Sequence, residues 1–401
     1  MAKYKKIVGL KPASPNQIKS VARKVSEGAS RYVVQHIEKF DQKNDIFKRT
    51  RWDSKVEYGK KYYSLVMPKE NKPGYTHLDM AFKNAAWWVE LAFAQSVWAG
   101  KVGLLAWESK QWGDSKPPNG LKLKVEDTQI LTQRIKKVGQ FFGADLVGVC
   151  ELDRRWIYSH SYNMKTHEYV PVEIPQDCKY AIVLAVEMDY EAMKCSPNYI
   201  QGAAGGLGYS AEAFVAGLLA QFVRALGYKA LPQGNDTSCG IPIAIDAGLG
   251  ELSRSGLLIT PKFGPRVRIA KIFTDLPLRP DGPIEFGVWA FCRMCRKCVD
   301  YCPSRAIIAG EPTTDVHNIS NRYGLLRWPI NAEKCIGFWA AQGSCSNCIR
   351  VCPFNKPAGL LHAAVKWGVK HVRWLHPLFI WADDLFRYGK QKSAEEFWGN
   401  T

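Results

Sequence analysis

Hydrophobic and polar positions alternate most clearly in the middle of the chain. Asp127 or Thr128 can cap a helix, which Gly143 then ends. Five apolar residues recur at helical spacing between these ends: Ile130, Leu131, Ile135, Val138 and Phe142. Two uninterrupted apolar runs, residues 146–150 and 180–188, have the length of buried strands. This part of the chain therefore predicts a helix followed by two strands.

A second helix is predicted over residues 214–223, with Gly227 just beyond its end. Its apolar face consists of Phe214, Val215, Leu218, Leu219, Phe222 and Val223. Alternating strands and helices favour a mixed α/β (α+β) layer over a helical bundle.

Breaker residues and changes of composition divide the chain into four predicted units. The stretch GDSKPPNG, residues 113–120, separates a first unit, residues 1–118, from the α/β unit, residues 119–284. A cysteine-rich unit follows over residues 285–360. The tail, residues 361–401, is rich in Trp and His and is expected to pack over the rest as one or two helices. With 401 residues, 46% of them hydrophobic, the chain can bury a large core.

Targeting signals and membrane spans are not evident in the sequence. The most apolar long segment, residues 85–100, is interrupted by Glu90 and Gln95, so no transmembrane segment is expected. The first ten residues, MAKYKKIVGL, contain neither an apolar signal core nor a twin-arginine pair. The chain is therefore expected to be cytoplasmic, or a mature form from which a leader has been removed.

Positive charge is concentrated near the N-terminus. The formal net charge is +18, and residues 1–72 hold 18 Lys and Arg against 7 Asp and Glu, a net +11. A solvated surface explains such a region, but attraction to an anionic membrane, an acidic electron donor or RNA also remains open.

Eight of the twelve cysteines fall into two runs that end in Cys-Pro. The two runs are Cys292-x2-Cys295-x2-Cys298-x3-Cys302 and Cys335-x9-Cys345-x2-Cys348-x3-Cys352. This spacing is typical of a paired 4Fe-4S ferredoxin module, in which the fourth cysteine of each run binds the other cluster. The assignment groups Cys292, Cys295, Cys298 and Cys352 on one cluster, and Cys335, Cys345, Cys348 and Cys302 on the other.

Two other uses of cysteine fit this spacing less well. Disulfide frameworks belong to short secreted chains, and zinc knuckles lack both the third close cysteine and the Cys-Pro ending. The long gap before Cys345 makes Cys335 the least secure of the eight ligands.

A glycine-rich stretch, residues 248–264, precedes the cysteine runs. It is a poor match to the dinucleotide motif GxGxxG, because Ser253 stands where the third glycine belongs. The glycines are expected to make tight turns or to let the backbone approach a large flat ligand. The predicted cofactor contacts are Gly248, Leu249, Gly250, Glu251, Ser255 and Gly256.

Iron–sulfur clusters transfer single electrons, so the α/β unit is expected to hold the centre that uses them. No second ligand set is visible, since His160, His167 and His317 are scattered. The fragment Asp315-x-His317 lacks the following glycine of the DxHxxG motif, which supplies a lower histidine ligand to cobalamin. An organic or corrinoid cofactor without an axial ligand from the protein fits better.

Several segments in order resemble the reductive dehalogenases. They are residues 143–160, 226–236, 244–278 and 379–390, together with the two cysteine runs. The resemblance extends from about residue 75 to the end of the chain. It implies a nitroreductase-like core that binds a base-off corrinoid, an attached ferredoxin-like module with two 4Fe-4S clusters, and replacement of halogen by hydrogen in an organohalide, as in organohalide respiration.

The resemblance also implies roles for individual residues. The family's proton-donating tyrosine matches Tyr209, its partner asparagine matches Asn235, and its arginine best matches Arg268, with Arg266 as competitor. A Tyr hydroxyl, with a reference pKa of about 10, is a weak acid, and a nearby guanidinium is expected to favour the phenolate and make it a better donor. The candidates for an apolar substrate pocket are Trp87, Trp88 and Trp339.

Partners and location follow from the same resemblance. We expect an organohalide substrate, an external electron donor (a ferredoxin, a flavodoxin or a quinol-linked membrane partner), a membrane anchor subunit and a homodimer, but no nucleic acid. A mature form would lie on the exoplasmic face of the cytoplasmic membrane. The sequence departs from the family in lacking a twin-arginine leader and in the short first gap of its second cysteine run.

Three alternatives remain at this point. Epoxyqueuosine reductase uses the same cofactors, and a positive chain suits tRNA, but the TPKFGPR and DDLFRYGK segments and Tyr209 resemble a dehalogenase. A plain electron-transfer protein would have no interior pocket in its α/β unit. A corrinoid-processing chaperone would not need two low-potential clusters.

Overall fold

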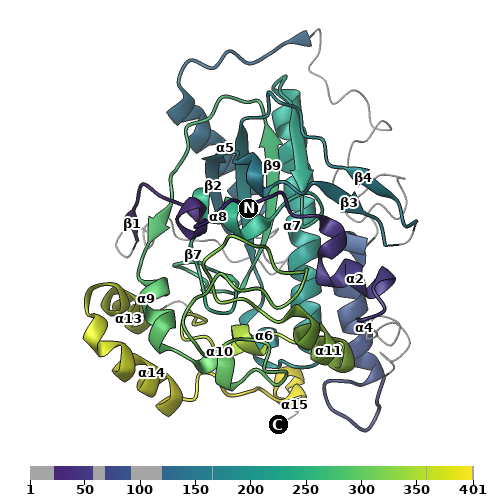
Figure 1. Ribbon diagram of the computed structural model, residues 1–401, viewed down its shortest axis with the longest axis vertical. Helices are drawn as coiled ribbons and strands as arrows, with labels where there is room; N and C mark the ends of the chain where they lie inside the picture. The colour runs from purple at the N-terminus through teal and green to yellow at the C-terminus, as the bar shows by residue number, and fades with distance from the viewer. Residues whose placement is uncertain (1–21, 57–67, 92–119, 165, 358, 400–401) are drawn as a thin grey trace.

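A four-stranded sheet forms the centre of the molecule (Figure 1). The computed structural model describes residues 22–56, 68–91, 120–164, 166–357 and 359–399. The sheet contains β2 (Leu146–Glu151), β5 (Tyr180–Glu187), β9 (Val267–Thr274) and β6 (Ala230–Gln233), in that order. Every neighbouring pair is antiparallel. The two predicted strands are thus confirmed, and the antiparallel pairing makes the unit α+β.

The side chains of β5 alternate between two hydrophobic cores, one on each face of the sheet. Ile182 and Leu184 pack with the helices α5 (Thr128–Phe142) and α7 (Tyr199–Ala225). Ala181, Val183 and Ala185 pack on the other face with α8 (Gly240–Asp246). All five residues are fully buried, which explains why this strand is a continuous apolar run in the sequence.

The two predicted helices are present. Asp127 caps α5 by accepting hydrogen bonds from the backbone N–H groups of Gln129 and Ile130, and Gly143 ends the helix with φ 121°. The predicted helix over residues 214–223 is only the C-terminal part of α7, which begins at Tyr199 behind an Asn198 cap. The glycines of its N-terminal half hid this part of the helix, because glycine lowers helix propensity.

Among the described helices, α7 alone is long and apolar enough to cross a membrane, judged by length and composition only. However, 61% of its most apolar window is buried inside the molecule. It lies between the sheet and α4 (His77–Ala86), which is the position of a core helix.

The first unit is interwoven with the later ones. β1 (Arg23–Lys24) pairs with β10 (Ile284–Glu285), and α4 packs along α7. The predicted boundary at residues 113–120 lies almost wholly outside the described residues. The four-unit division therefore stays a prediction.

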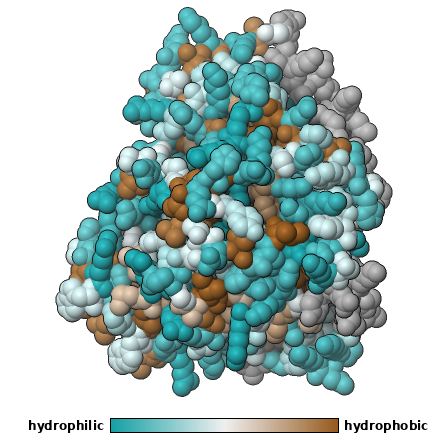
Figure 2. Space-filling model, viewed as in Figure 1, coloured by the Kyte–Doolittle hydropathy of each residue, from teal (hydrophilic) through white to brown (hydrophobic). Residues whose placement is uncertain are grey.

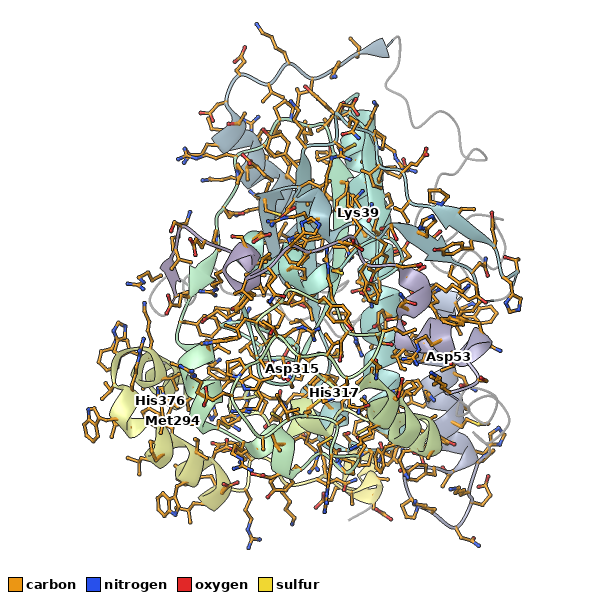
Figure 3. All side chains as sticks on the ribbon, viewed as in Figure 1. Lys39, Asp53, Met294, Asp315, His317 and His376 are labelled. Atoms are coloured by element: carbon orange, nitrogen blue, oxygen red, sulfur yellow. The ribbon has the colours of Figure 1, made fainter. Side chains whose placement is uncertain are left out.

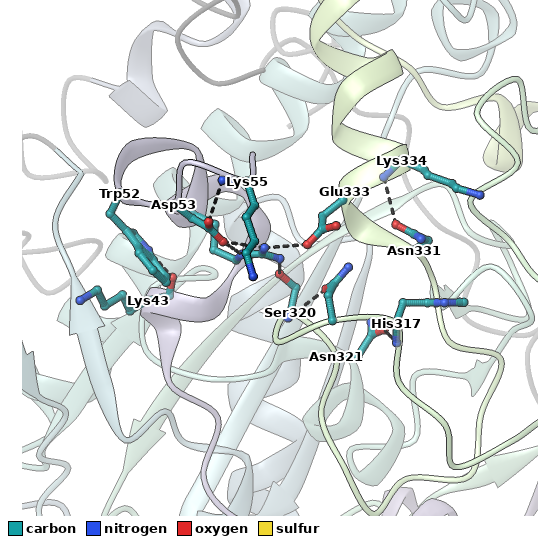
Figure 4. Close-up of polar contacts among 12 residues, drawn as sticks. Lys43, Trp52, Asp53, Lys55, His317, Ser320, Asn321, Asn331, Glu333 and Lys334 are labelled. Carbon is teal, nitrogen blue, oxygen red and sulfur yellow. Dashed lines mark hydrogen bonds and ion pairs between the residues drawn. The ribbon is translucent and has the colours of Figure 1, made fainter. Parts of the chain in front are cut away.

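Arg49 connects α2 (Ile46–Trp52) to the cysteine-rich unit. Figure 4 labels three residues that meet at this connection, Asp53, Ser320 and Glu333. The buried Arg49 guanidinium contacts Asp53 at 2.6 Å, Glu333 at 2.6 Å and the Ser320 hydroxyl at 3.0 Å. Glu333 begins α11 (Ala332–Gln342), the helix that carries Cys335. The N-terminal segment thus holds one of the predicted cluster ligands in place.

The remaining elements complete the layers around the sheet. They are η2 (Ala29–Tyr32), η3 (Gln42–Asn44), η7 (Arg154–Trp156), β3 (His160–Tyr162), β4 (Tyr169–Pro171), α6 (Tyr190–Lys194), β7 (Glu251–Leu252), β8 (Leu258–Ile259), α9 (Val288–Met294), α10 (Lys297–Asp300), α12 (Asn347–Arg350), α13 (Leu360–His371), η8 (Arg373–Leu375), α14 (His376–Leu385) and α15 (Ala394–Trp398). The tail is helical, but it forms α13, α14 and α15 where one or two helices were expected. Figure 2 shows a largely hydrophilic face with hydrophobic residues gathered near its centre.

Candidate functional site

The structure brings the predicted catalytic residues together. The Tyr209 hydroxyl oxygen accepts hydrogen bonds from Asn235 Nδ2 at 3.0 Å and from Arg268 Nη1 at 3.2 Å. The Arg268 guanidinium lies 4.2 Å from the centre of the Tyr209 ring. Trp87 stacks on the ring, with centroids 5.1 Å apart and an interplanar angle of 29°. Tyr209 is therefore fixed by an arginine, an indole and an amide.

Glycines in α7 make this arrangement possible. A Cβ atom at Gly206 would lie 2.3 Å from Trp87 Cδ1, and one at Gly208 would lie 2.8 Å from Arg268 Cγ. Both separations are too short for any larger residue without displacing its neighbour. The sequence interpretation used the GGLGY motif to locate Tyr209, but it did not foresee the close contacts that its glycines allow.

Burial dominates the acidity of Tyr209. It raises the pKa of the phenol above its ordinary value, while the Arg268 charge lowers it and the Glu212 and Glu90 charges raise it further. The expected effect of the guanidinium is present but is outweighed. The phenol therefore keeps its proton at neutral pH, which a proton donor requires.

The two competing arginines have different surroundings. Arg266 is 1% exposed, and it donates to Asn355 Oδ1 at 2.9 Å, to the Glu187 carboxylate and to the Met188 carbonyl. Such contacts make Arg266 a structural tie between β9 and the loop that follows the second cysteine run. Arg268 is the arginine that faces Tyr209.

The three tryptophans predicted to line the substrate pocket lie in different surroundings. Trp87 lies against Tyr209. Trp88 is 63% exposed, and Trp339 on α11 packs edge-on against Phe47 of α2, with ring centroids 5.2 Å apart. A pocket role for Trp88 and Trp339 stays a prediction.

The glycine-rich stretch approaches the chain's own backbone. A Cβ at Gly248 would lie 2.4 Å from the Gly282 carbonyl oxygen, and one at Gly250 would lie 2.1 Å from the Ile259 carbonyl oxygen. Gly256, after Ser255, has φ 73° and makes a turn. Close packing and turns account for these glycines, so the geometry supplies no independent support for a cofactor contact there.

Two residues next to these glycines also make contacts within the protein. Leu249 is part of the hydrophobic core. The buried Glu251 carboxylate accepts hydrogen bonds from the backbone N–H groups of Phe286 at 2.6 Å and Val288 at 3.3 Å, and pairs with Arg31 at 3.7 Å. Glu251 therefore holds the start of α9, and its predicted cofactor contact remains without support from the structure.

Unsatisfied buried donors lie near the catalytic residues. They belong to Gln233, Ser238, Arg268, Arg322, Arg327 and Asn355, and none has a hydrogen-bond partner within the described residues. The charges of Arg322 and Arg327 both lower the burial-raised pKa of Cys239, which follows Ser238 in the chain and precedes α8. Each unpaired buried donor costs about 1–3 kcal/mol. A large ligand rich in amides and carbonyls, such as a corrinoid, fits this set.

The charges that act on two of the eight cysteines are compatible with the predicted grouping, which stays a prediction. Burial raises the pKa of Cys298, and the charges of Cys292, Cys352, Cys348 and Cys295 raise it further. Burial also raises the pKa of Cys348. The charges of four cysteines raise it further: Cys345, Cys335, Cys302 and Cys352. For each of these two cysteines, the other three members of its predicted group act on the pKa, together with one cysteine of the other group. Cys335, the least secure ligand in the sequence, lies with Cys345 and Cys302.

The spacing of these thiols bears on the zinc alternative. No three His, Cys, Asp or Glu side chains in the described ranges are close enough to hold a single metal ion. A tetrahedral zinc ion needs its sulfur ligands at about 2.3 Å. The third close cysteine and the Cys-Pro ending of each run remain the argument for a cubane cluster, whose four irons each take one thiolate.

Arg254 anchors the loop of the first cysteine run. It is 1% exposed, and its guanidinium donates to the carbonyl oxygens of Cys292 at 2.9 Å, Ile308 at 3.0 Å, Gly310 at 2.8 Å and Arg293 at 3.2 Å. The sequence interpretation missed this residue, because nothing in the local pattern shows which distant carbonyls an arginine will meet.

The Asp315-x-His317 fragment is not part of the site. It lies in the loop that precedes α11 (Figure 3). His317 is exposed, and its backbone N–H donates to Asn321 Oδ1 at 2.9 Å. This agrees with the conclusion that the fragment does not supply a metal ligand.

Comparison with known proteins agrees with this geometry. Residues 291–355 match the family described as "4Fe-4S double cluster binding domain". The chain is 34% identical over 361 residues to the tetrachloroethene reductive dehalogenase of Sulfurospirillum multivorans, covering 82% of this chain and 72% of that enzyme. It is 36% identical over 359 residues to the enzyme of the same name from Desulfitobacterium hafniense, covering 73% of this chain and 65% of that enzyme.

The fold gives the same result. A solved reductive dehalogenase, described as suggesting a mechanism for B12-dependent dehalogenation, superposes with a TM-score of 0.73 at 26% identity. That match covers 93% of this chain but only 49% of the solved one, so the chain spans about half the length of this relative. An epoxyqueuosine reductase from Lactococcus garvieae matches only 29% of this chain, at 28% identity.

The fold and the two cysteine groups define an iron–sulfur oxidoreductase with a double 4Fe-4S module. Within that class, the chain belongs to the reductive dehalogenase family.

Proposed function

We propose that this chain replaces halogen by hydrogen in a small organohalide. The reaction consumes two electrons and one proton, breaks the carbon–halogen bond, forms a carbon–hydrogen bond and releases halide. The observation that carries the proposal is the Tyr209 hydroxyl, which accepts hydrogen bonds from Asn235 and Arg268. Chlorinated ethenes are the first substrates to test, because the curated relatives act on tetrachloroethene by name.

The three residues have separate roles in the proposal. Tyr209 gives its phenolic proton to the carbon that has lost halogen. Arg268 stabilises the phenolate that forms, since a cation 3.2 Å from the oxygen favours negative charge there. Asn235 donates at 3.0 Å and fixes the direction of the hydroxyl. Trp87 keeps the ring in place by stacking.

The cofactors follow from family membership and from the residues that would hold them. When bound, a base-off corrinoid supplies electrons to the carbon–halogen bond. The unpaired donors of Gln233, Ser238, Arg322 and Arg327 would bind its polar periphery. Contacts from Gly248, Leu249, Gly250, Glu251, Ser255 and Gly256 remain part of the proposal, although these residues also serve packing.

Two 4Fe-4S clusters would relay the electrons. Cys292, Cys295, Cys298 and Cys352 hold one, and Cys335, Cys345, Cys348 and Cys302 hold the other. Cys335 alone among these eight is exposed as a residue, whereas burial raises the pKa of its thiol to about 12. The exposure of Cys335 supports docking of the electron donor beside the second cluster.

Partners and location extend the proposal. The chain receives electrons from an external ferredoxin, flavodoxin or quinol-linked membrane protein, binds an anchor subunit and forms a homodimer on the exoplasmic face of the membrane. The basic N-terminal region, with a net +11 over residues 1–72, suits an acidic donor or an anionic membrane surface.

Anaerobic reconstitution tests the proposal. The protein is refolded with iron, sulfide and cobalamin, and chloride release from tetrachloroethene is followed with reduced viologen as donor. We expect corrinoid uptake, eight irons per chain for two cubanes, and chloride release. A protein that takes up both cofactors but releases no halide from chlorinated ethenes, haloaromatics or haloalkanes would contradict the proposal.

A further inference from the structure

A second acid lies one helical turn beyond Tyr209. Glu212 is on the same helix, α7, three residues further along, so its side chain projects to the same side as Tyr209. It is 2% exposed, and its Oε2 atom has no hydrogen-bond partner among the described residues. A carboxyl group in this situation is costly as an anion and is favoured as a neutral acid.

Charged groups from three other elements surround Glu212. Its pKa is raised to about 8. Burial is the largest cause, Glu90 after α4 also raises the pKa, Arg268 and Lys271 of β9 lower it, and Asp236 after β6 raises it. Both cations also make hydrogen bonds to other groups: Arg268 Nη1 donates to Tyr209, and Lys271 Nζ donates to the Gly234 carbonyl. Glu212 thus holds a proton at neutral pH.

Tyr209 needs a new proton after every turnover. Its two hydrogen-bond donors cannot supply one, because a guanidinium is not deprotonated in proteins and a side-chain amide is not an acid. After Arg268, Glu212 is the ionisable group whose charge most affects the Tyr209 pKa. The proton source must therefore be sought among the carboxyl groups.

We propose that Glu212 stores the proton that restores the Tyr209 phenol after each turnover, an inference that rests on the proposed function. The O–H bond of Glu212 breaks, the O–H bond of Tyr209 forms, and the negative charge moves from the phenolate to the Glu212 carboxylate. Arg268 and Lys271 stabilise the carboxylate until it is protonated again.

Glu90 provides the route by which Glu212 regains its proton. It is half-buried, and its backbone N–H donates to Ser210 Oγ at 3.2 Å, in the turn of α7 that carries Tyr209. The charge of Glu90 raises the pKa of both Tyr209 and Glu212. Glu90 is thus the more accessible of the two carboxyl groups whose charges act on Tyr209, and in the proposal it passes a proton to Glu212.

Glu212→Gln tests this order, because it keeps the shape of the side chain and removes the proton. Cofactor-loaded, fully reduced enzyme is mixed with tetrachloroethene, and the first turnover is compared with the steady state. We expect an unchanged first turnover, since Tyr209 already holds its proton, and a steady-state rate reduced about 100-fold or more, as for other lost acid–base groups. Glu212→Asp should restore most of the rate.

The pH profile and a control variant sharpen the test. The wild-type steady-state rate should fall as pH rises through about 8, where Glu212 loses its proton, and this fall should be absent in Glu212→Gln. Glu191→Gln, an exposed carboxyl of α6 that pairs with Lys392, should behave as wild type. An unchanged steady state in Glu212→Gln overturns the inference, and so does an equal loss in both phases. A wild type without a first turnover would instead contradict the proposed function.

Infrared spectroscopy gives a readout that is independent of activity. The protonated carboxyl band of Glu212 should be present at pH 7 in wild type and in Glu191→Gln, should disappear above pH 8 to 9, and should be missing in Glu212→Gln. If wild type and Glu212→Gln show identical carboxyl bands at pH 7, Glu212 is ionised and the inference is wrong.

Discussion

Gly208→Ala should impair catalysis by displacing Arg268 without touching any reacting group. The added Cβ would lie 2.8 Å from Arg268 Cγ and 3.1 Å from Met188 Cγ, whereas ordinary contact begins at 3.4 Å. Arg268 must retreat by about 0.6 Å at its middle. Its hydrogen bond to Tyr209 is already 3.2 Å long, so this shift breaks it.

The size of the effect follows from the bond that is lost. A hydrogen bond to a charged group contributes about 1.5–3 kcal/mol, which corresponds to a loss of about 10- to 100-fold in rate. The helix itself gains about 0.5–1 kcal/mol from replacing glycine by alanine, so global stability should change little.

The assay compares chloride release by Gly208→Ala with that by Leu207→Ala, its neighbour on the outer side of the same turn. Leu207 is 48% exposed, so its truncation should leave the rate unchanged. Both variants should retain wild-type iron and corrinoid content. If Gly208→Ala is as active as wild type while a solved structure shows Arg268 displaced, the assigned role of Arg268 is refuted.

Three further changes test other parts of the account. Asn235→Ala removes the neutral donor to Tyr209, worth about 0.5–1.5 kcal/mol, and should slow chloride release up to about tenfold with unchanged cofactor content. Arg254→Met removes a donor from four carbonyl oxygens around the first cysteine run, of which that of Gly310 still accepts from Trp328 Nε1. The change should lower the iron content and the melting temperature, and a full complement of eight irons would contradict this. Arg49→Met should lower the free energy of unfolding by about 3 kcal/mol. This value is at the lower end of the range for breaking a buried ion pair, because Glu333 is partly exposed. Burial opposes ionisation of Asp53, but the Lys55 N–H and Arg49 together hold its pKa below the ordinary value. The stability that the ionised Asp53 contributes should therefore be full above about pH 4 and lost in stronger acid. Urea unfolding of wild type and Arg49→Met should then converge in stronger acid.

The parts of the fold that were predicted correctly are those with strong local patterns. β2 and β5 are continuous apolar runs because both faces of the sheet are covered, and α5 has a capping Asp127 and a terminal Gly143. The antiparallel strand order could not be predicted, since pairing between β5 and β9 joins residues about ninety positions apart. Hydrophobic periodicity contains no information on such pairing.

The site was predicted in part for the same reason. Spacing alone grouped the cysteines, and the family resemblance supplied Tyr209, Asn235 and Arg268. Glu212 was missed because a single carboxyl in an apolar helix resembles an exposed position until the tertiary structure shows that it is 2% exposed. The glycines of α7 were missed because their role is set by Trp87 and Arg268, which lie far away in sequence.

The most direct test of the central claim is the product of one reaction run with wild type and Tyr209→Phe side by side. Each protein is loaded with iron, sulfide and cobalamin, reduced with viologen and given tetrachloroethene in heavy water. The account predicts that wild type releases one chloride for each product molecule, which carries one deuterium where chlorine was lost. Tyr209→Phe with the same iron and cobalamin content should release chloride at a rate about 100-fold lower than wild type, or lower still. Equal chloride release and equal deuteration by the two proteins would contradict the account.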